Sequence, residues 1–381
     1  MCKGREPAAG KAKNCLPSDS PDFGQALPGP LKITRSRVFP CCMVPTMSRT
    51  ATIDIHAHIL PEETIRLLGK VSPRVAPKLT TQGDGSTIME IAGKVVQRPM
   101  PRGCWDLEQR LADMAKHGID MQAICATVHT FFYDEEPSLA TTCAVLQNDQ
   151  IAAVVTRHPD RFVGLATLPL QAPQRAADEL KRAMRTLGLR GAQIGTNVNG
   201  KNLDDPALDP LWAAANELKA FILVHPHGEI LPGERLKSYY MRNFVGLPFE
   251  TTMAGAALVF GGVIERHPDI AFCLCHGGGF VPYQAGRFLH AYEVRAEPKV
   301  RLRGSPEDSM ARLHHDSIVH SARALAFLID TVGAEHVLLG SDYPFDMGDL
   351  DCVARVTSLA LPPKVRDAVL GARAKALLSN A

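Results

Sequence analysis

The chain has 381 residues, of which 45% are hydrophobic and 22% charged, so it is long enough to bury a large core. Its formal net charge of +2 gives no reason to expect nucleic acid or an anionic membrane surface as a partner. It contains no apolar run of about 18 residues, the length needed to cross a membrane. The ten cysteines are scattered rather than spaced as a disulfide framework, which favours a reducing, cytosolic location.

Residues 1–47 differ in composition from the rest of the chain. They are rich in Pro, Gly, Ser, Lys and Arg and show no helical or strand period, so we expect a disordered extension. They lack the apolar core of a secretory signal, and their prolines and acidic residues argue against a mitochondrial presequence. We expect the functional domain to span residues 48–381, and translation from Met47 would leave it intact.

The first predicted strand, residues 51–57, leads into two histidines that flank one alanine, His56 and His58. Side chains alternate between the two faces of a strand, so both imidazoles are expected to point the same way. Buried imidazoles need a polar partner, and one divalent metal ion can bind two of them. The alternative is a pair of strand-end histidines bonded to backbone or water, because a short motif remains a hypothesis.

The stretch after this strand, residues 60–104, is too long for a simple connection. We expect it to form a small insertion, with a hairpin over about 77–98, close to the functional end of the domain. Insertions of this kind commonly carry substrate contacts.

The remainder of the chain alternates between strand and helix patterns. Further strands are predicted at 123–128, 162–168, 191–196, 220–226, 271–277, 313–318 and 336–341. Helices are predicted at 106–117, 138–157, 173–187, 206–218, 251–267, 281–294, 320–332 and 363–378. Eight such units predict a (β/α)8 TIM barrel. A doubly wound open sheet is the main alternative, but no glycine-rich phosphate fingerprint follows the first strand to support it.

Three of the later strands also end on an ionisable residue, namely His225, His276 or Asp342. A TIM barrel presents the carboxyl ends of all its strands at one mouth, so these residues should meet the first histidine pair there. Three neutral imidazoles and one carboxylate suit a zinc-like divalent ion that keeps a position for water. We predict that the metal ligands are His56, His58, His225 and Asp342.

The fourth strand, 191–196, offers no lysine to bridge a second metal ion, so a single ion is expected. His276 is then free to act as acid or base, or to hold the metal-bound water, whose pKa a metal lowers to about 7. Asp342 is expected to orient this water as well as bind the metal. His227 lies two residues past His225, and it is either an alternative ligand or a residue that faces the substrate.

Taken together, these segments resemble the metal-dependent decarboxylase branch of the amidohydrolase superfamily over nearly all of residues 51–378. The motifs that carry the resemblance are Asp54-x-His56-x-His58, Cys104-Trp105-Asp106, Arg161-Phe162-Val163-Gly164-Leu165-Ala166-Thr167-Leu168-Pro169, Gln193-Ile194-Gly195-Thr196, His225-Pro226, Glu250-Thr251-Thr252, His276-Gly277-Gly278-Gly279 and Ser341-Asp342-Tyr343-Pro344. The first motif is shared by the whole superfamily, whereas the later segments are more specific to this branch.

The resemblance implies a zinc-dependent, non-oxidative decarboxylase. The positions that match the family's zinc ligands are His56, His58, His225 and Asp342, and His276 matches its catalytic histidine, which activates the metal-bound water. No organic cofactor is implied, because the conjugated substrate is its own electron sink.

The resemblance also implies four substrate contacts. Arg98 matches an arginine that binds a substrate carboxylate, and Arg287 matches a second one that the neighbouring subunit contributes, which implies a homodimer. Phe345 matches a pocket aromatic residue, and Tyr240 stands where the family has Trp. Guanidinium groups keep their charge and bind carboxylates through two hydrogen bonds. Without the resemblance, both arginines would be interpreted as exposed surface charges.

Three pocket positions depart from the family pattern and leave the substrate open. Gln97 replaces an aromatic residue, His227-Gly228 replaces a Trp-Asp pair, and Tyr240 replaces Trp. The alternatives are therefore a decarboxylase of isoorotate, salicylate or resorcylate type, or a metal-dependent lactone or amide hydrolase, since hydroxide attack uses the same groups. A barrel that binds metal without catalysis is disfavoured, because His276 would then be a spare histidine beside a complete ligand set.

Overall fold

The computed structural model describes residues 50–227 and 233–379 of the chain. The predicted disordered extension, residues 1–47, lies outside the described residues. Within the described part, no helix is both long and apolar enough to cross a bilayer.

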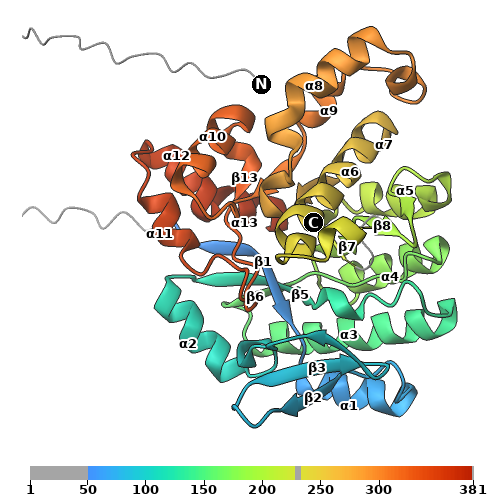
Figure 1. Cartoon of the computed structure of the whole chain (residues 1–381), viewed down its shortest axis with the longest axis vertical. Helices are drawn as coiled ribbons and strands as arrows, with labels where there is room; N and C mark the ends of the chain where they lie inside the picture. The colour runs from blue at the N-terminus through green and yellow to red at the C-terminus, as the bar shows by residue number, and fades with distance from the viewer. Residues whose placement is uncertain (1–49, 228–232, 380–381) are drawn as a thin grey trace, which may run out of the picture. The chain divides into compact units, whose positions relative to one another are not determined.

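Parallel strands form the centre of the described domain (Figure 1). Three of them make one sheet, in the order β1 (Ile53–Ile59), β5 (Met121–Ala126) and β6 (Phe162–Gly164). Five make a second sheet, in the order β7 (Gly191–Gly195), β10 (Phe221–His225), β11 (Ala271–Leu274), β12 (His314–Asp316) and β13 (Val337–Leu338). Parallel bridges from Ala57 to Tyr343 and from Ala166 to Ala192 join the two sheets into a ring. The predicted (β/α)8 barrel is thereby confirmed.

Helices follow the strands and cover the outside of the ring. The longer ones are α2 (Leu107–His117), α3 (Pro137–Arg157), α4 (Pro173–Arg185), α5 (Asp209–Glu217), α6 (Leu247–Phe260), α8 (Val281–Val294) and α10 (Ala322–Val332). The shorter ones are α7 (Val263–Arg266), α9 (Pro306–Met310), α11 (Cys352–Thr357), α12 (Pro363–Asp367) and α13 (Arg373–Ser379). The predicted helices 251–267 and 363–378 are each divided in two in the structure, as α6 with α7 and as α12 with α13.

The insertion after β1 is more elaborate than the predicted hairpin. It contains α1 (Glu62–Val71) and an antiparallel sheet of β2 (Lys78–Thr81), β3 (Thr87–Ile91) and β4 (Lys94–Gln97). The third strand arises because Ala92 and Gly93 both adopt positive φ, 51° and 74°, as a two-residue turn between strands requires. Met89 of this sheet packs with Leu60 and Phe345, so the insertion lies beside the end of β1.

The inside of the barrel is filled by apolar side chains. Phe221 and Leu223 of β10 pack there with Leu338 of β13. Ala374 and Leu378 of α13 belong to the same cluster, so this short helix closes the amino-terminal end of the barrel. The polar strand-end residues therefore lie at the opposite, carboxyl-terminal end.

A β-bulge in β1 decides where its histidines point. Asp54 pairs with Gln122, but the next pair is Ala57 with Ile124, so β1 contains one extra residue between them. Such a bulge reverses the alternation of the side chains. Asp54 consequently points outward to Gln122, whereas His58, opposite the interior residue Cys125, points into the barrel mouth.

Candidate metal centre

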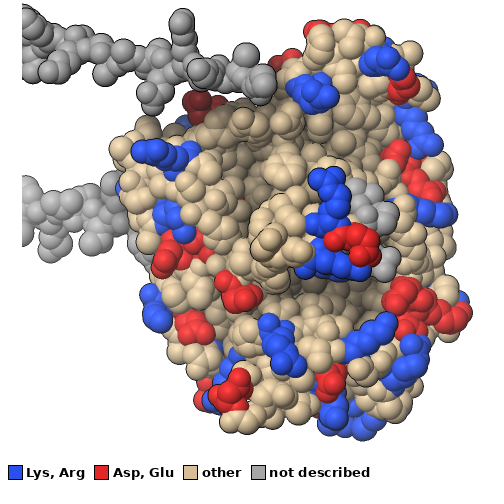
Figure 2. Space-filling model, viewed as in Figure 1, with Lys and Arg blue, Asp and Glu red and all other residues tan. Residues whose placement is uncertain are grey.

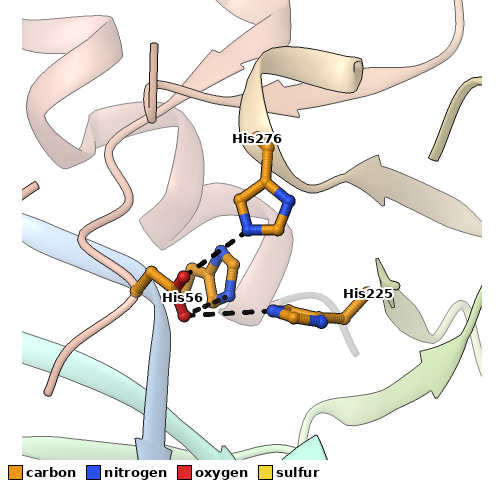
Figure 3. A group of neighbouring side chains, drawn as sticks. His56, His225 and His276 are labelled. Carbon is orange, nitrogen blue, oxygen red and sulfur yellow. Dashed lines mark ion pairs between the residues drawn. The ribbon is translucent and has the colours of Figure 1, made fainter. Parts of the chain in front are cut away.

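Four residues from three segments meet at the barrel mouth, three imidazoles around one carboxylate oxygen. Asp342 Oδ1 lies 2.9 Å from His58 Nε2, 3.4 Å from His56 Nε2 and 3.9 Å from His225 Nε2. The side chains come from β1, from the end of β10 and from the loop after β13, and all four residues are buried. Figure 3 shows His56, His225 and His276 converging on one carboxylate, with the ion pairs to it drawn as dashed lines.

The hydrogen bonds of the three imidazoles leave their Nε2 atoms as lone-pair donors. Each Nδ1 faces an acceptor behind the site: Asp316 Oδ2 at 2.8 Å from His56, Ala126 O at 3.4 Å from His58 and Pro226 O at 2.7 Å from His225. A neutral imidazole carries a single N–H group. The acceptors place it on Nδ1, so each Nε2 keeps a free lone pair. His225 Nε2 is buried and has no hydrogen-bond partner among the described residues. Three lone pairs and a carboxylate oxygen in close proximity repel one another unless a cation lies between them, so this set of donors fits a divalent metal ion.

His276 approaches the other oxygen of the same carboxylate. Its Nε2 lies 3.5 Å from Asp342 Oδ2, whereas the three other imidazoles face Oδ1. Ligand atoms of His56, His225, His276 and Asp342 all lie within 4.8 Å of one another. Distance alone therefore admits His276 as a ligand, but its position on Oδ2 separates it from the group around Oδ1. The roles of the five predicted residues stay predictions, although the structure does bring the five together.

The backbone at both strand ends adopts an unusual conformation. His276 and Asp342 have positive φ, 56° and 57°, which residues other than glycine rarely adopt and which is frequent at functional sites. The glycines that follow His276 are required by close packing. A Cβ atom on Gly278 would lie 2.1 Å from His315 Nδ1, and one on Gly279 would lie 2.2 Å from the Pro248 carbonyl oxygen.

The electrostatic environment keeps the carboxylate charged. Burial alone would raise the pKa of Asp342, but the imidazoles of His56, His225 and His276 hold it well below its usual value. Burial lowers the pKa of His225 well below its usual range and also lowers that of His58, so both imidazoles are neutral. Burial opposes a charge on His56 as well, yet its anionic neighbours raise its pKa well above the usual value.

Asp316, at the end of β12, contacts the site and was not among the predicted site residues. Its Oδ2 accepts from His56 Nδ1 at 2.8 Å and from the His276 backbone N–H at 2.9 Å, and its Oδ1 accepts from the Gly277 N–H at 2.7 Å. Asp316 therefore orients the imidazole of His56 and fixes the backbone at the strand end that carries His276. The available signal was a carboxylate within the predicted strand 313–318. Asp316 and His56 also lie near the Cys275 thiol, but the carboxylate is already committed to these donors.

Asp54 likewise acts behind the site rather than in it. Its Oδ1 accepts from the backbone N–H groups of His56 and Ser341, both at 3.0 Å. Its Oδ2 accepts from the Ser341 hydroxyl at 2.5 Å and from the Gln122 amide at 3.0 Å. The carboxylate therefore ties β1 to the segment that carries Asp342.

Two of the four predicted substrate contacts lie near the centre. The Phe345 ring is 5.2 Å from that of His58 and 6.0 Å from that of His129, a residue that the sequence reasoning also missed. Tyr240 is 57% exposed, and partial burial together with Asp346 and Asp342 raises the pKa of its hydroxyl, so it belongs to the rim of the mouth.

The two predicted arginines are exposed and form no hydrogen bond or ion pair with the five residues of the centre, within the part of the chain that the structure describes. Arg98 follows β4 and lines a surface hollow with Gln82, Asp84 and Ser86. Arg287 lies on the outer face of α8. On the face drawn in Figure 2, cationic and anionic side chains are interspersed rather than gathered into a patch of one sign.

His227 packs against an aromatic wall. Its ring lies 5.1 Å from Phe131 and 4.9 Å from Tyr133, edge-on to both. It occupies the space over Gly195, where a Cβ atom would lie 2.2 Å from the imidazole. It forms no ion pair with Asp342 in the described structure, in contrast to the four other histidines. This position favours the wall of the mouth over the predicted alternative of a metal ligand.

Comparison with known proteins identifies relatives over most of the chain. A family model for amidohydrolases matches residues 53–379. The 2-amino-3-carboxymuconate-6-semialdehyde decarboxylase of Dictyostelium discoideum is 37% identical over 303 residues, which cover 79% of this chain and 84% of that protein. The enzyme of the same name from Caenorhabditis elegans is 30% identical over 378 residues, 86% of this chain and 94% of that protein.

The fold also matches solved structures. The 5-carboxyvanillate decarboxylase LigW from Sphingomonas paucimobilis superimposes with a TM-score of 0.74 at 23% identity, over 87% of this chain and 99% of that chain. A 2,6-dihydroxybenzoate decarboxylase in complex with 2,6-dihydroxybenzoate superimposes with a TM-score of 0.71 at 22% identity, over 87% and 100% of the two chains. At these identities the similarity concerns the fold, and it agrees with the barrel described above.

Proposed function

Because this chain belongs to the amidohydrolase family, in its metal-dependent decarboxylase branch, and is thus a carboxy-lyase, we propose that it decarboxylates 2-amino-3-carboxymuconate-6-semialdehyde with the help of one zinc ion. The two relatives that carry this name support the choice of substrate, since they align with 79% and 86% of the chain. The reaction would place the protein in tryptophan breakdown through kynurenine, where it limits the formation of quinolinate.

A single observation carries the proposal of a metal centre. Three imidazole Nε2 atoms from β1 and β10 converge on Oδ1 of the charged Asp342 carboxylate, at 2.9, 3.4 and 3.9 Å. The proposed ligands are His56, His58, His225 and Asp342. When bound, a zinc ion would supply Lewis-acid polarisation and lower the pKa of a water molecule.

The surrounding residues would transfer the proton and orient the ligands. His276, whose Nε2 lies 3.5 Å from the opposite oxygen of Asp342, would take a proton from water and give it to the carbon that loses the carboxylate, and the hydroxide left behind would regain a proton from solvent. Asp342 shares this proton path through its Oδ2. Asp316 fixes the orientation of His56 and holds the backbone of His276. The electron pair of the breaking C–C bond passes into the conjugated substrate as carbon dioxide leaves.

Substrate binding is assigned to residues around the mouth. Phe345, 5.2 Å from His58, offers a flat surface for a conjugated acid, and Tyr240 lies at the rim. Arg98 and Arg287 would bind carboxylates, with Arg287 reaching the site of a second subunit. A homodimer is supported by two exposed aromatic residues, since Tyr283 of α8 is 73% exposed and Tyr239, between β10 and α6, is 86% exposed. Both arginines are exposed in the single chain, as residues that await a substrate or a partner would be.

A second candidate substrate class is an aromatic acid of isoorotate, salicylate or resorcylate type. His227 favours it, because it forms an aromatic wall with Phe131 and Tyr133 where the family has a Trp-Asp pair. A γ-resorcylate decarboxylase of Rhizobium radiobacter is 27% identical over 68% of this chain.

The location and extent of the working protein follow from the same reasoning. The described cysteines are free and buried, which supports a reducing compartment such as the cytosol. We assign catalysis to residues 48–381.

The test is a direct comparison of substrates with the metal-loaded enzyme. Freshly prepared aminocarboxymuconate semialdehyde, isoorotate and γ-resorcylate are supplied in parallel, and carbon dioxide release and substrate absorbance are followed. The proposal expects turnover of the first compound, its loss after treatment with a chelator, and its recovery with Zn²⁺. Turnover of a resorcylate alone would favour the second substrate class. Hydrolysis of a lactone or amide without carbon dioxide release would remove the protein from this reaction class.

A further inference from the structure

Arg110 of α2 is a buried cation close to the candidate metal centre. Its side chain is 0% exposed, and burial is the main cause that lowers its pKa. Among residues 50–227 and 233–379 it forms no ion pair with a carboxylate, and carbonyl and amide oxygens surround it instead. Because a buried charge without an ionic partner is costly, its presence indicates that the guanidinium serves the architecture around it.

The guanidinium group contacts four separate segments of the chain beside β1. Its Nη2 donates to the carbonyl oxygen of His58, its Nη1 to Gln122 Oε1 at 2.8 Å and its Nε to the Gly103 carbonyl at 3.2 Å. Its Cζ atom lies over the Tyr343 ring, 4.7 Å from the ring centre. One side chain thus bridges β1, β5, the end of the insertion and the residue that follows Asp342.

A chain of hydrogen bonds connects Arg110 to the other histidine of β1, His56. The Gln122 amide that accepts from Arg110 donates in turn to Asp54 Oδ2 at 3.0 Å. Asp54 Oδ1 accepts from the backbone N–H of His56 at 3.0 Å. Arg110 therefore reaches His58 directly and His56 through two intermediates.

Arg110 also contacts the segment that carries Asp342, through the ring of Tyr343. The Tyr343 hydroxyl donates to Asp113 Oδ2 at 2.7 Å, which fixes the ring under Arg110. The Tyr343 carbonyl accepts from the His58 backbone N–H at 2.7 Å. Asp342 directly precedes Tyr343. Arg110 contacts both the His58 carbonyl and the Tyr343 ring, so it fixes the position of Asp342 relative to His58.

We propose that Arg110 is a positioning residue of the metal centre, which sets the spacing between the two β1 histidines and Asp342. The inference rests on the proposed metal centre and does not depend on the identity of the substrate. It requires the planar fork of arginine, because a lysine ammonium is a point charge that cannot bind His58 and Gln122 at once in this geometry. Residues that orient metal ligands from behind typically change metal affinity by about 10- to 100-fold when replaced.

The experiment measures metal binding to the full-length chain without substrate. Metal-free wild type, Arg110→Lys and Arg110→Met are titrated with Co²⁺, and the dissociation constant and the visible spectrum of the bound ion are recorded. We expect the dissociation constant to rise by about 10- to 100-fold in both variants, with a changed spectrum. Arg161→Lys is the matched control, because Arg161 also donates to backbone carbonyls, that of Asp120 at 2.8 Å and that of Ile119 at 3.4 Å, but forms no hydrogen bond with a residue of the metal centre in the described structure.

Thermal unfolding of each variant separates positioning from stability. A lower unfolding temperature with a wild-type dissociation constant and spectrum in Arg110→Lys would overturn the proposal. Should neither Arg110 variant fold, Gln122→Leu removes the acceptor of Arg110 Nη1 and the hydrogen bond to Asp54 but leaves the bond from Arg110 to the His58 carbonyl, and it is expected to weaken Co²⁺ binding. Unchanged binding in that variant would also overturn the proposal. A wild type that binds Co²⁺ but decarboxylates none of the candidate acids would count against the proposed function alone.

Discussion

The two ends of the same barrel are built from opposite kinds of residue. At the carboxyl-terminal end, β1, β10 and the segment after β13 contribute His56, His225 and Asp342, which are buried and polar. At the amino-terminal end, Phe221 of the same β10 packs with Leu378 of the closing helix α13. A few residues along one strand thus separate a reactive group from a purely apolar contact.

This contrast teaches that the barrel separates stability from chemistry. The apolar end needs only complementary volume, so its side chains contact one another. Each polar group at the mouth needs a specific partner, and Asp316 and Asp54 supply several of these behind the ligands. Substitutions at the mouth should therefore change chemistry more than stability, and those at the closed end should do the reverse.

The largest effect is expected at His276, where the contrast is sharpest. His276→Ala should keep the metal but lower kcat by about 10²- to 10⁴-fold, because the proposed proton transfer is lost. Metal content and kcat are measured together, with His290→Ala on the exposed part of α8 as the control. Loss of the metal from His276→Ala would instead place this residue among the ligands.

A smaller effect is expected for Arg98 at the edge of the insertion. Arg98→Ala should raise KM by about ten- to a hundredfold, because a hydrogen bond to a charged group contributes about 1.5–3 kcal/mol. Steady-state kinetics give the ratio, and the stability should stay within error since the side chain is exposed. Arg102→Ala is the control, because Arg102 is 72% exposed and paired with Asp106 at 2.7 Å. An unchanged KM would remove Arg98 from the site.

The closed end should respond in the opposite sense. Leu378→Ala removes buried volume from the plug of the barrel and should reduce the free energy of unfolding by about 2–4 kcal/mol. Urea denaturation measures this loss, while kcat and metal affinity should stay at wild-type values. Lys375→Ala, exposed on the same helix, is the control. A Leu378→Ala enzyme that keeps its stability but loses kcat would break the separation between the two ends.

The smallest effect concerns pH and the buried His315 of β12. Burial lowers the pKa of this imidazole to about 4, against a usual value of 6.5 in the unfolded chain. As the pH falls from 6.5 to about 4, the unfolded state takes up a proton that the folded state does not, so the free energy of unfolding decreases. His315→Gln should make this decrease shallower, measured by urea denaturation of metal-free protein at several pH values. Parallel curves for the two proteins would contradict it.

The sequence was most informative where local chemistry and period coincide. The strand ends at His225, His276 and Asp342 could be recognised because each follows a short apolar run, and the barrel then predicts that they meet. The sequence does not predict the third strand of the insertion, because the turn at Ala92 and Gly93 lies inside the predicted hairpin 77–98. The roles of Asp316 and Arg110 were missed for another reason, since the partners that define them are 260 and 52 residues away in the chain.

By itself, the sequence determined the order of strands and helices and the residue types at the mouth, because both follow from patterns within a few neighbouring positions. The tertiary structure alone decided the bulge that turns His58 inward and Asp54 outward, and the side of the Asp342 carboxylate that each imidazole faces. These features depend on how strands register against one another. Register is set by packing across the whole ring, and no local stretch of sequence encodes it.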